Sequence, residues 1–427
     1  MEVCGSFVVI NPYLILRNTC LTLKNGKIVL LAPNVGDVED DLTIITHGFA
    51  SLHTHLGLYP IRHTLFYGKN LDSWVTDFVW PWERLLRQEP KLSYYSALLA
   101  LNELIRSGVT AVADMHFNEE LIANILEEVG VKGDLCTAIM EKGVFDNFEE
   151  AVEENLSLIQ SLQNKPGIAV RLGPCTPRAL TPAQVKYVID LAIELRVGIH
   201  MHAGEVYADN EYITKFFGLS MGDFFKYIRL GAVDTILAHG IWLLDGLSTL
   251  IGRPVVITHS PRSNMLLNND LINVGRIIAE GVEVALAVDV APTYSILDEL
   301  RTFLYVQRPK SLDYYDIYRM ITVVPYRSMG FGTGSLIVNE PADLAIWKIN
   351  NKLGYTIKSK LNILAPHLMS IILGALAEGS AKLQSLYASG KLIIKDEEPI
   401  IPQSEVSKAN DKIAEAIRDL FGKSASP

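Results

Sequence analysis

The sequence predicts an α/β protein with a closed (β/α)8 barrel at its centre and a small β-sandwich domain formed from both chain ends. Three observations support this fold class. Short apolar, β-branched runs recur eight times between about residues 45 and 292, amphipathic stretches separate them, and the flanking segments are strand-like. Continuous apolar strands are typical of parallel sheets that are buried on both faces. An open, doubly wound sheet is the structural alternative.

The eight apolar runs are the predicted barrel strands. Along the chain they are ITHGFASLHTHL, GVTAVADMHF, VKGDLCTAIM, IAVRLGPCTP, VGIHMHAGE, TILAHGIWL, PVVITHSPRSN and VEVALAVDVAP. The stretches between them have apolar residues at helical spacing, which predicts helices over 92–107, 119–128, 147–163 and 181–195.

The flanking segments predict the domain organisation. Residues 6–47, 335–350 and 386–398 are strand-like, and neither flank is large enough for a sheet domain of its own. We therefore expect three parts, which are a composite β-domain from 1–48 and 335–400, a hydrolase barrel over 49–334, and a C-terminal helix and tail over 401–427. The helix is expected over 405–421. The apolar stretch 361–377 is interrupted by polar residues and is too short to span a membrane, so we expect a buried or interface helix there.

Composition excludes several classes of protein. The 427 residues are 49% hydrophobic and 20% charged, which excludes a disordered, collagen-like or coiled-coil chain. A net charge of −10 argues against a nucleic-acid partner. Four cysteines are too few for a disulfide framework, and the N-terminus has no basic region before its apolar stretch. We expect a cytoplasmic protein without a membrane partner.

Histidines at the ends of predicted barrel strands indicate a metal site. His53 and His55 form an H-x-H pair whose side chains point the same way on a strand, so both can reach one ion. His202 closes the fifth strand, three residues before Glu205. Neutral imidazoles suit zinc or iron, and a nearby carboxylate can carry protons.

Three further residues fall at the same face of the predicted barrel. Asp289 lies in an apolar run, where a buried carboxylate needs a partner such as a metal. His239, at the end of the sixth strand, would by itself be read as an ordinary buried histidine. His259 is equally consistent with a site wall and with loop structure, whereas His200 is expected to be a packed residue or a support for a ligand.

Taken together, the motifs resemble the amidohydrolase superfamily, in its cytosine deaminase-like, chlorohydrolase and methylthioadenosine/S-adenosylhomocysteine deaminase branch. The similarity runs from about residue 5 to 400 in the order and spacing of that branch. The matching segments are GFASLHTHL, LDSWVTDFVWPWERLL, SGVTAVADMHF, IHMHAGE, LAHG, THSPRSN, AVDVAP, GSLIVNEPADLAIW and LYASGKLII.

The resemblance implies roles for individual residues. The metal ligands would be His53, His55, His202 and Asp289, holding one divalent ion, with zinc expected before iron or manganese. Glu205, His239 and Asp289 would be the catalytic acid–base groups. The implied reaction is release of ammonia from a purine, pyrimidine or related N-heterocycle by attack of a metal-bound hydroxide.

The predicted substrate contacts include both matches to the family pattern and departures from it. Glu83 matches a substrate-binding glutamate of the adenosine-type members. Cys175 replaces the histidine usual after strand four, and Arg178 follows it, so we expect both to contact the substrate. Val290 replaces the usual glycine after the aspartate. Trp82, like Trp74 and Trp80, either stacks on a flat ring or packs in the core, and of the three we expect Trp82 to contact the substrate. The chain has no arginine between Arg106 and Arg171, which argues against the carboxylate of S-adenosylhomocysteine.

Alternative functions remain at this stage. The same site would also suit a ring chloride, a cyclic amide or a guanidine-type C–N bond. A non-catalytic barrel scaffold is disfavoured by the intact ligand set. A barrel enzyme for phosphate sugars would need a glycine-rich loop after strands seven and eight, which this chain lacks. Family habit implies a homodimer, for which 361–377 offers a surface.

Overall fold

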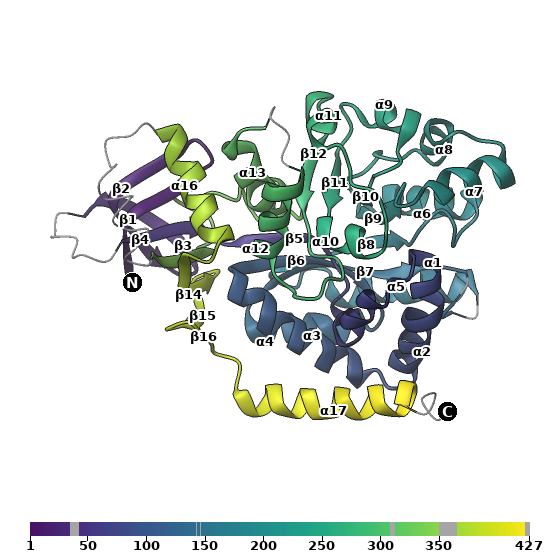
Figure 1. Cartoon of the computed structure of the whole chain (residues 1–427), viewed down its shortest axis with the longest axis horizontal. Coiled ribbons are helices and arrows are strands. Elements are labelled where there is room, and N and C mark those ends of the chain that lie inside the picture. The colour runs from purple at the N-terminus through teal and green to yellow at the C-terminus, as the bar shows by residue number, and fades with distance from the viewer. Residues whose placement is uncertain (35–41, 142, 146, 308–311, 350–364, 423–427) are drawn as a thin grey trace.

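A computed structural model describes residues 1–34, 42–141, 143–145, 147–307, 312–349 and 365–422 of the chain. Two eight-stranded sheets organise it, one made from both chain ends and one forming the barrel (Figure 1). The sheet of the chain ends lies beside the barrel, and the C-terminal helix α17 (Gln403–Phe421) runs along the outside of the barrel and packs on α3 (Lys91–Leu104).

The barrel strands are all parallel and follow the chain in order around the sheet. Beyond the last strand, the backbone N–H of Asp289 donates to the carbonyl oxygen of His53 at 3.0 Å, which joins the sheet's two edges. This confirms the predicted barrel and excludes the open sheet. The strands are β5 (Phe49–Thr54), β6 (Val109–His116), β7 (Lys132–Ile139), β8 (Ile168–Pro174), β9 (Gly198–Ala203), β10 (Thr235–His239), β11 (Val255–His259) and β12 (Glu283–Leu286).

Helices surround the barrel and include those predicted from the amphipathic stretches. Besides α3 and α17, they are α1 (Leu71–Trp74), α2 (Trp80–Gln88), α4 (Glu119–Val129), α5 (Phe148–Leu162), α6 (Pro182–Leu195), α7 (Tyr207–Phe217), α8 (Met221–Ile228), α9 (Leu247–Leu250), α10 (Pro261–Leu266), α11 (Val274–Ala279), α12 (Ile296–Thr302), α13 (Tyr314–Ile321), α14 (Val323–Ser328) and α16 (Ala365–Ala377). Three further segments are 3-10 helices, η1 (Leu56–Tyr67), η3 (Ile105–Ser107) and η4 (Leu244–Gly246). Two are π-helical, η2 (Val75–Val79) and η5 (Phe303–Gln307).

The helix α14 closes one end of the barrel. Small inward side chains, such as Ala111 and Ala285, leave space there that Tyr326 of α14 and Met329, directly after it, fill. The phenolic oxygen of Tyr326 also hydrogen-bonds Thr110, at the start of β6. With this end filled, the opposite end, where the strands reach their carboxyl termini, is left for a site.

The second sheet joins the two chain ends. The N-terminal β4 pairs in parallel with β1 and antiparallel with the C-terminal β13, so neither end of the chain builds the sheet alone. Its strands are β1 (Glu2–Asn11), β2 (Leu14–Lys24), β3 (Lys27–Pro33), β4 (Thr43–His47), β13 (Leu344–Ile349), β14 (Ala381–Ala388), β15 (Lys391–Lys395) and β16 (Glu398–Pro399).

Two local features of this sheet differ from the sequence analysis. Residues 335–338 were expected to be a strand, but only one backbone bond, from Leu336 N–H to the carbonyl of Ile10, ties them to β1. Cys4 and Cys20 lie directly opposite each other on β1 and β2 and form a disulfide. Cysteine count and spacing do not show this pairing, because it depends on the register of two strands.

The apolar stretch predicted over 361–377 contains α16, whose Met369, Ile372 and Leu373 are buried in the main core. Residues 361–364 lie outside the described residues. Within the described ranges, no helix combines the length and apolar character that crossing a lipid bilayer requires.

A buried ion pair joins the barrel to the terminal sheet, and we expect its loss to destabilise the fold. Lys132 Nζ, at the start of β7, lies 2.5 Å from both carboxylate oxygens of Asp343. Lys132→Met leaves the Asp343 charge buried without its partner, so the free energy of unfolding should fall by about 3 kcal/mol or more. Lys69→Met, which breaks an exposed pair with Asp77, is the control and should cost at most about 1 kcal/mol. Equal losses in chemical denaturation would contradict this account.

Candidate metal centre and active site

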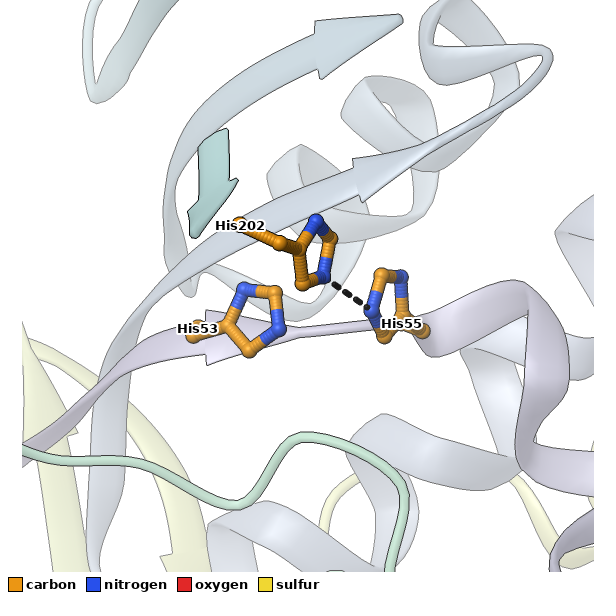
Figure 2. Close-up of side chains that lie close together, drawn as sticks. All are labelled: His53, His55 and His202. Carbon is orange, nitrogen blue, oxygen red and sulfur yellow. Dashed lines mark hydrogen bonds between the residues drawn. The ribbon is translucent and has the colours of Figure 1, made fainter. Parts of the chain in front are cut away.

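The predicted ligands meet at the carboxyl-terminal end of the barrel. His53 and His55 come from the end of β5, His202 from β9, and Asp289 follows β12. Figure 2 shows the three imidazoles turned toward one another across the two strands. The Nε2 atoms of His55 and His202 are 3.3 Å apart, and Asp289 Oδ1 lies 3.5 Å from Nε2 of both His53 and His55. The possible ligand atoms of His53, His55 and His202 all lie within 4.8 Å of one another, and so do those of His53, His239 and Asp289.

The contact between His55 and His202 points directly to a cation. Nδ1 of His55 lies 2.7 Å from the carbonyl oxygen of Met115, and Nδ1 of His202 lies 2.8 Å from that of Cys175. A carbonyl oxygen only accepts, so each Nδ1 carries the hydrogen and each neutral ring leaves its Nε2 as a lone pair. Two lone pairs that face each other at 3.3 Å repel, and a shared positive ion removes that repulsion.

His200 supports the third imidazole. Its Nε2 lies 2.8 Å from Nδ1 of His53 and can accept the hydrogen that His53 carries there. In that tautomer, Nε2 of His53 is unprotonated and matches Nε2 of His55 and His202. Metal-binding imidazoles commonly donate their second N–H in this way, which fixes the ring orientation.

The protonation states also suit a metal. Burial lowers the pKa of His53, His55 and His202, to about 4 for His55, so the rings are neutral at neutral pH. Three neutral nitrogens and one carboxylate are a donor set that fits a divalent ion such as zinc.

Two residues of this site also have a strained backbone conformation. His239 has φ 69° and Asp289 has φ 57°, in the left-handed region that residues with a Cβ rarely adopt. Such conformations cost free energy and are concentrated at functional sites. Here they occur at two of the predicted catalytic residues.

His239 is oriented by an asparagine that the sequence analysis did not single out. Nδ1 of His239 lies 3.0 Å from Oδ1 of Asn264, so the ring donates to the amide oxygen, and Nε2 is left near Glu205 and Asp289 at 3.7 and 3.9 Å. Burial lowers the pKa of His239, but the two carboxylates more than offset it, and the pKa is raised. His239 can therefore carry a proton on Nε2.

Two hydrogen bonds fix the position of Glu205. Asn269 donates its side-chain N–H to Oε1 of Glu205 at 3.1 Å, and the backbone N–H of Glu205 donates to Asp209 at 2.9 Å. Since Oε1 already accepts, Oε2 is the oxygen left to carry a proton. Burial raises the pKa of Glu205 to about 7, so the carboxyl exchanges protons near neutral pH. No motif in the sequence identified Asn269 as its partner.

A cavity of about 420 Å³ opens beside these residues, within the ~300–1,000 Å³ typical of small-molecule sites. Its lining combines the site with a mainly apolar wall, much of it from the segment between β5 and α3. The lining residues are His55, Leu58, Leu71, Asp72, Trp74, Val75, Thr76, Val79, Trp80, Glu83, Met140, Cys175, Thr176, Arg178, Ala179, His202, Glu205, His239, Ser263, Leu267, Asp289 and Val290.

The predicted substrate contacts are not all at this cavity. Glu83, Cys175 and Arg178 line it, and burial raises the pKa of Glu83 to about 8 and of the Cys175 thiol to about 12. Trp82 is a correction, because it is fully buried, lies outside the lining and donates its indole N–H to the carbonyl of Gly57 at 2.8 Å. His259 is also fully buried and outside the lining.

Comparison with known proteins agrees with this geometry. The sequence model of the Amidohydrolase family matches residues 44–376, most of the chain. The chain belongs to this family. A 5-methylthioadenosine/S-adenosylhomocysteine deaminase of Desulforudis audaxviator is 30% identical to this amidohydrolase over 356 residues, which cover 77% of this chain and 81% of the relative. A 5'-deoxyadenosine deaminase of Methanobrevibacter smithii is 30% identical over 354 residues, with 78% and 80% covered.

A solved structure shares the whole fold of the amidohydrolase. An adenosine deaminase from Xanthomonas campestris with bound zinc superposes with a TM-score of 0.84 at 21% identity, covering 98% of both chains. The predicted fold class, a barrel with a second sheet built from both chain ends, is thus confirmed. The relatives confirm the predicted reaction class, in which a hydrolase of the deaminase type acts on C–N bonds.

Proposed function

We propose that this amidohydrolase deaminates adenine nucleosides with a small, uncharged 5' substituent, such as 5'-methylthioadenosine and 5'-deoxyadenosine, with zinc as its metal. The facing Nε2 atoms of His55 and His202 carry the metal part of this proposal, because a cation between them would remove the repulsion of their lone pairs beside the cavity. The names of the relatives support the adenine nucleoside, and the zinc of the Xanthomonas structure supports the metal.

The metal would be held by His53, His55, His202 and Asp289. When bound, a divalent ion at such a site lowers the pKa of water and makes a nucleophile available near neutral pH. Asp289 lies between the ligand imidazoles and His239, at 3.5 and 3.9 Å, so its carboxylate is placed to take the proton from the attacking water.

The remaining acid–base steps belong to Glu205 and His239. Glu205 donates a proton from Oε2 to the ring nitrogen beside the carbon under attack, so negative charge does not build up there. The imidazolium of His239 hydrogen-bonds the oxygen that adds to this carbon and stabilises the tetrahedral intermediate. A proton then reaches the amine, the C–N bond breaks and ammonia departs. The product that remains is a hypoxanthine nucleoside.

The cavity wall supplies the substrate contacts. Trp74 and Trp80 line it, in place of the predicted Trp82, and offer flat surfaces for a purine. The buried carboxyl of Glu83 can hydrogen-bond ribose hydroxyls. The apolar side chains of Leu71, Val75 and their neighbours favour an apolar substituent such as a methylthio group.

The test is ammonia release from a nucleoside panel by zinc-loaded protein. We expect one equivalent each of ammonia and hypoxanthine nucleoside from 5'-methylthioadenosine and 5'-deoxyadenosine, and little from cytosine, guanine or amino-triazines. Turnover of the triazines or of cytosine in preference to the adenine nucleosides would replace this proposal with another substrate of the same site.

The pH dependence follows from Glu205. Its proton is lost as the pH rises through about 7, so kcat/KM should fall about tenfold per unit at higher pH. The residual activity of Glu205→Gln should lack this basic limb, because the amide does not titrate. Profiles of kcat/KM between pH 5.5 and 9 test this, and a flat profile for the wild-type protein in this range would contradict it.

Location and assembly complete the proposal. We keep the cytoplasm as the proposed location and a homodimer as the proposed assembly, both from the sequence analysis. The proposed ligand is a small molecule, and the net charge of −10 disfavours nucleic acid.

A further inference from the structure

Arg178 is held between two carboxylates beside the active-site cavity. Its Nη1 donates to Asp72 Oδ1 at 2.5 Å, and its Nε lies 2.8 Å from Asp209 Oδ1. Burial alone would lower the pKa of Arg178, but the charges of Asp209 and Asp72 outweigh it and raise the pKa. The guanidinium is therefore permanently charged and already paired on both sides.

The two carboxylates differ in how firmly they are fixed. The Asp209 side chain, on α7, is 1% exposed and also accepts the backbone N–H of Glu205, so it belongs to the rigid part of the site. The Asp72 side chain is 66% exposed and lies on the four-residue helix α1 of the cavity wall. Asp72 is therefore the partner of Arg178 that faces solvent and that a ligand would meet at the outer part of the cavity.

The charge balance of the cavity follows from this pairing. Among the described lining residues, Arg178 is the one lysine or arginine, whereas Asp72, Glu83, Glu205 and Asp289 contribute carboxyl groups. A substrate carboxylate arriving here would meet a neutralised guanidinium and an exposed negative charge, so its desolvation would not be offset. An uncharged substituent avoids this cost and can pack on the apolar wall.

We propose that Asp72 determines substrate specificity by occupying Arg178, so that the cavity selects nucleosides with an uncharged distal substituent and rejects those with a carboxylate. This inference rests on the proposed function and specifies the group accepted at the 5' end. Removing the Asp72 charge frees Nη1 of Arg178 for a carboxylate of the substrate, which it can bind with charge-assisted hydrogen bonds, while Nε stays beside Asp209.

The test compares two substrates that differ in charge and hardly in size, adenosine-5'-carboxamide and adenosine-5'-carboxylic acid. The measured quantity is the ratio of kcat/KM for the acid to kcat/KM for the amide. Wild-type protein should prefer the amide, and Asp72→Asn should raise the ratio about tenfold or more, the scale of a charge-assisted hydrogen bond. Asp72→Ala provides a second variant with the same expectation.

Asp77→Asn is the matched control. Asp77 lies on the same wall segment, is exposed, and pairs with Lys69 at 3.2 Å outside the cavity lining, so its replacement should leave the ratio unchanged. An unchanged ratio in both Asp72 variants, an equal rise in Asp77→Asn, or a wild-type preference for the acid would each overturn the inference.

A binding measurement separates this inference from the proposed function. Dissociation constants of the same two nucleosides, followed by tryptophan fluorescence, should show the same change of preference without turnover. If no adenine nucleoside is deaminated, the proposed function fails while the dissociation constants still test the role of Asp72. If deamination occurs and neither ratio changes, only the inference about Asp72 fails.

Discussion

Glu205→Gln lowers kcat for deamination by about 100-fold or more, while the protein keeps its fold and its metal. The amide oxygen of glutamine can still accept the N–H of Asn269, so the side chain stays in place. What is lost is the ionisable proton, whose pKa burial raises to about 7, and general acid–base groups contribute about 10²–10⁴-fold. Steady-state kinetics, metal content and circular dichroism measure the three expectations.

Glu211→Gln is the control for this variant. Glu211 is exposed on α7, six residues further along the chain, and should be replaced without effect on kcat. A folded, metal-loaded Glu205→Gln protein with near wild-type turnover would remove Glu205 from the acid–base chemistry.

His202→Ala loses the metal together with the activity. Its imidazole faces Nε2 of His55 at 3.3 Å, so its removal takes away one of the proposed nitrogen ligands of the ion. Loss of a residue that only supports a ligand commonly costs 10–100-fold in affinity or activity, so loss of the ligand itself should cost more than about 100-fold. Elemental analysis should find about one zinc per wild-type chain and a small fraction of that in the variant.

The control is His63→Ala, because His63 is exposed on η1 and lies outside the cavity lining. It should bind zinc and turn over substrate like the wild-type protein. Full zinc occupancy in His202→Ala, or an equal loss in His63→Ala, would show that the metal is held elsewhere.

The convergence of the proposed metal ligands could be predicted because barrel geometry links sequence position to space. Parallel strands present their carboxyl ends at one rim, so a histidine at the end of β5 and another at the end of β9 must approach each other. The period of two along a strand places His53 and His55 on the same side. Asp289 could be added because a carboxylate in an apolar run requires a partner.

Other parts of the site depend on contacts that no local pattern encodes. The bonds from Asn269 to Glu205 and from Arg178 to Asp72 join residues 64 and 106 positions apart in loops and short helices. Trp80 and Trp82 are two positions apart, which is about 200° on a helix, so they face opposite ways. The sequence did not show which one faces the cavity, and Trp82 was wrongly chosen. The Cys4–Cys20 disulfide was missed because it depends on the register between two strands, which the sequence does not show.

The central claim is that three imidazoles and one carboxylate hold a catalytic ion. A crystal structure of the zinc-loaded protein, with anomalous data at the zinc edge, tests this claim most directly. The account predicts one strong peak within bonding distance of the Nε2 atoms of His53, His55 and His202 and of the Asp289 carboxylate, at the cavity. A peak bound at other residues, or zinc-loaded crystals with no peak among these four side chains, would contradict it.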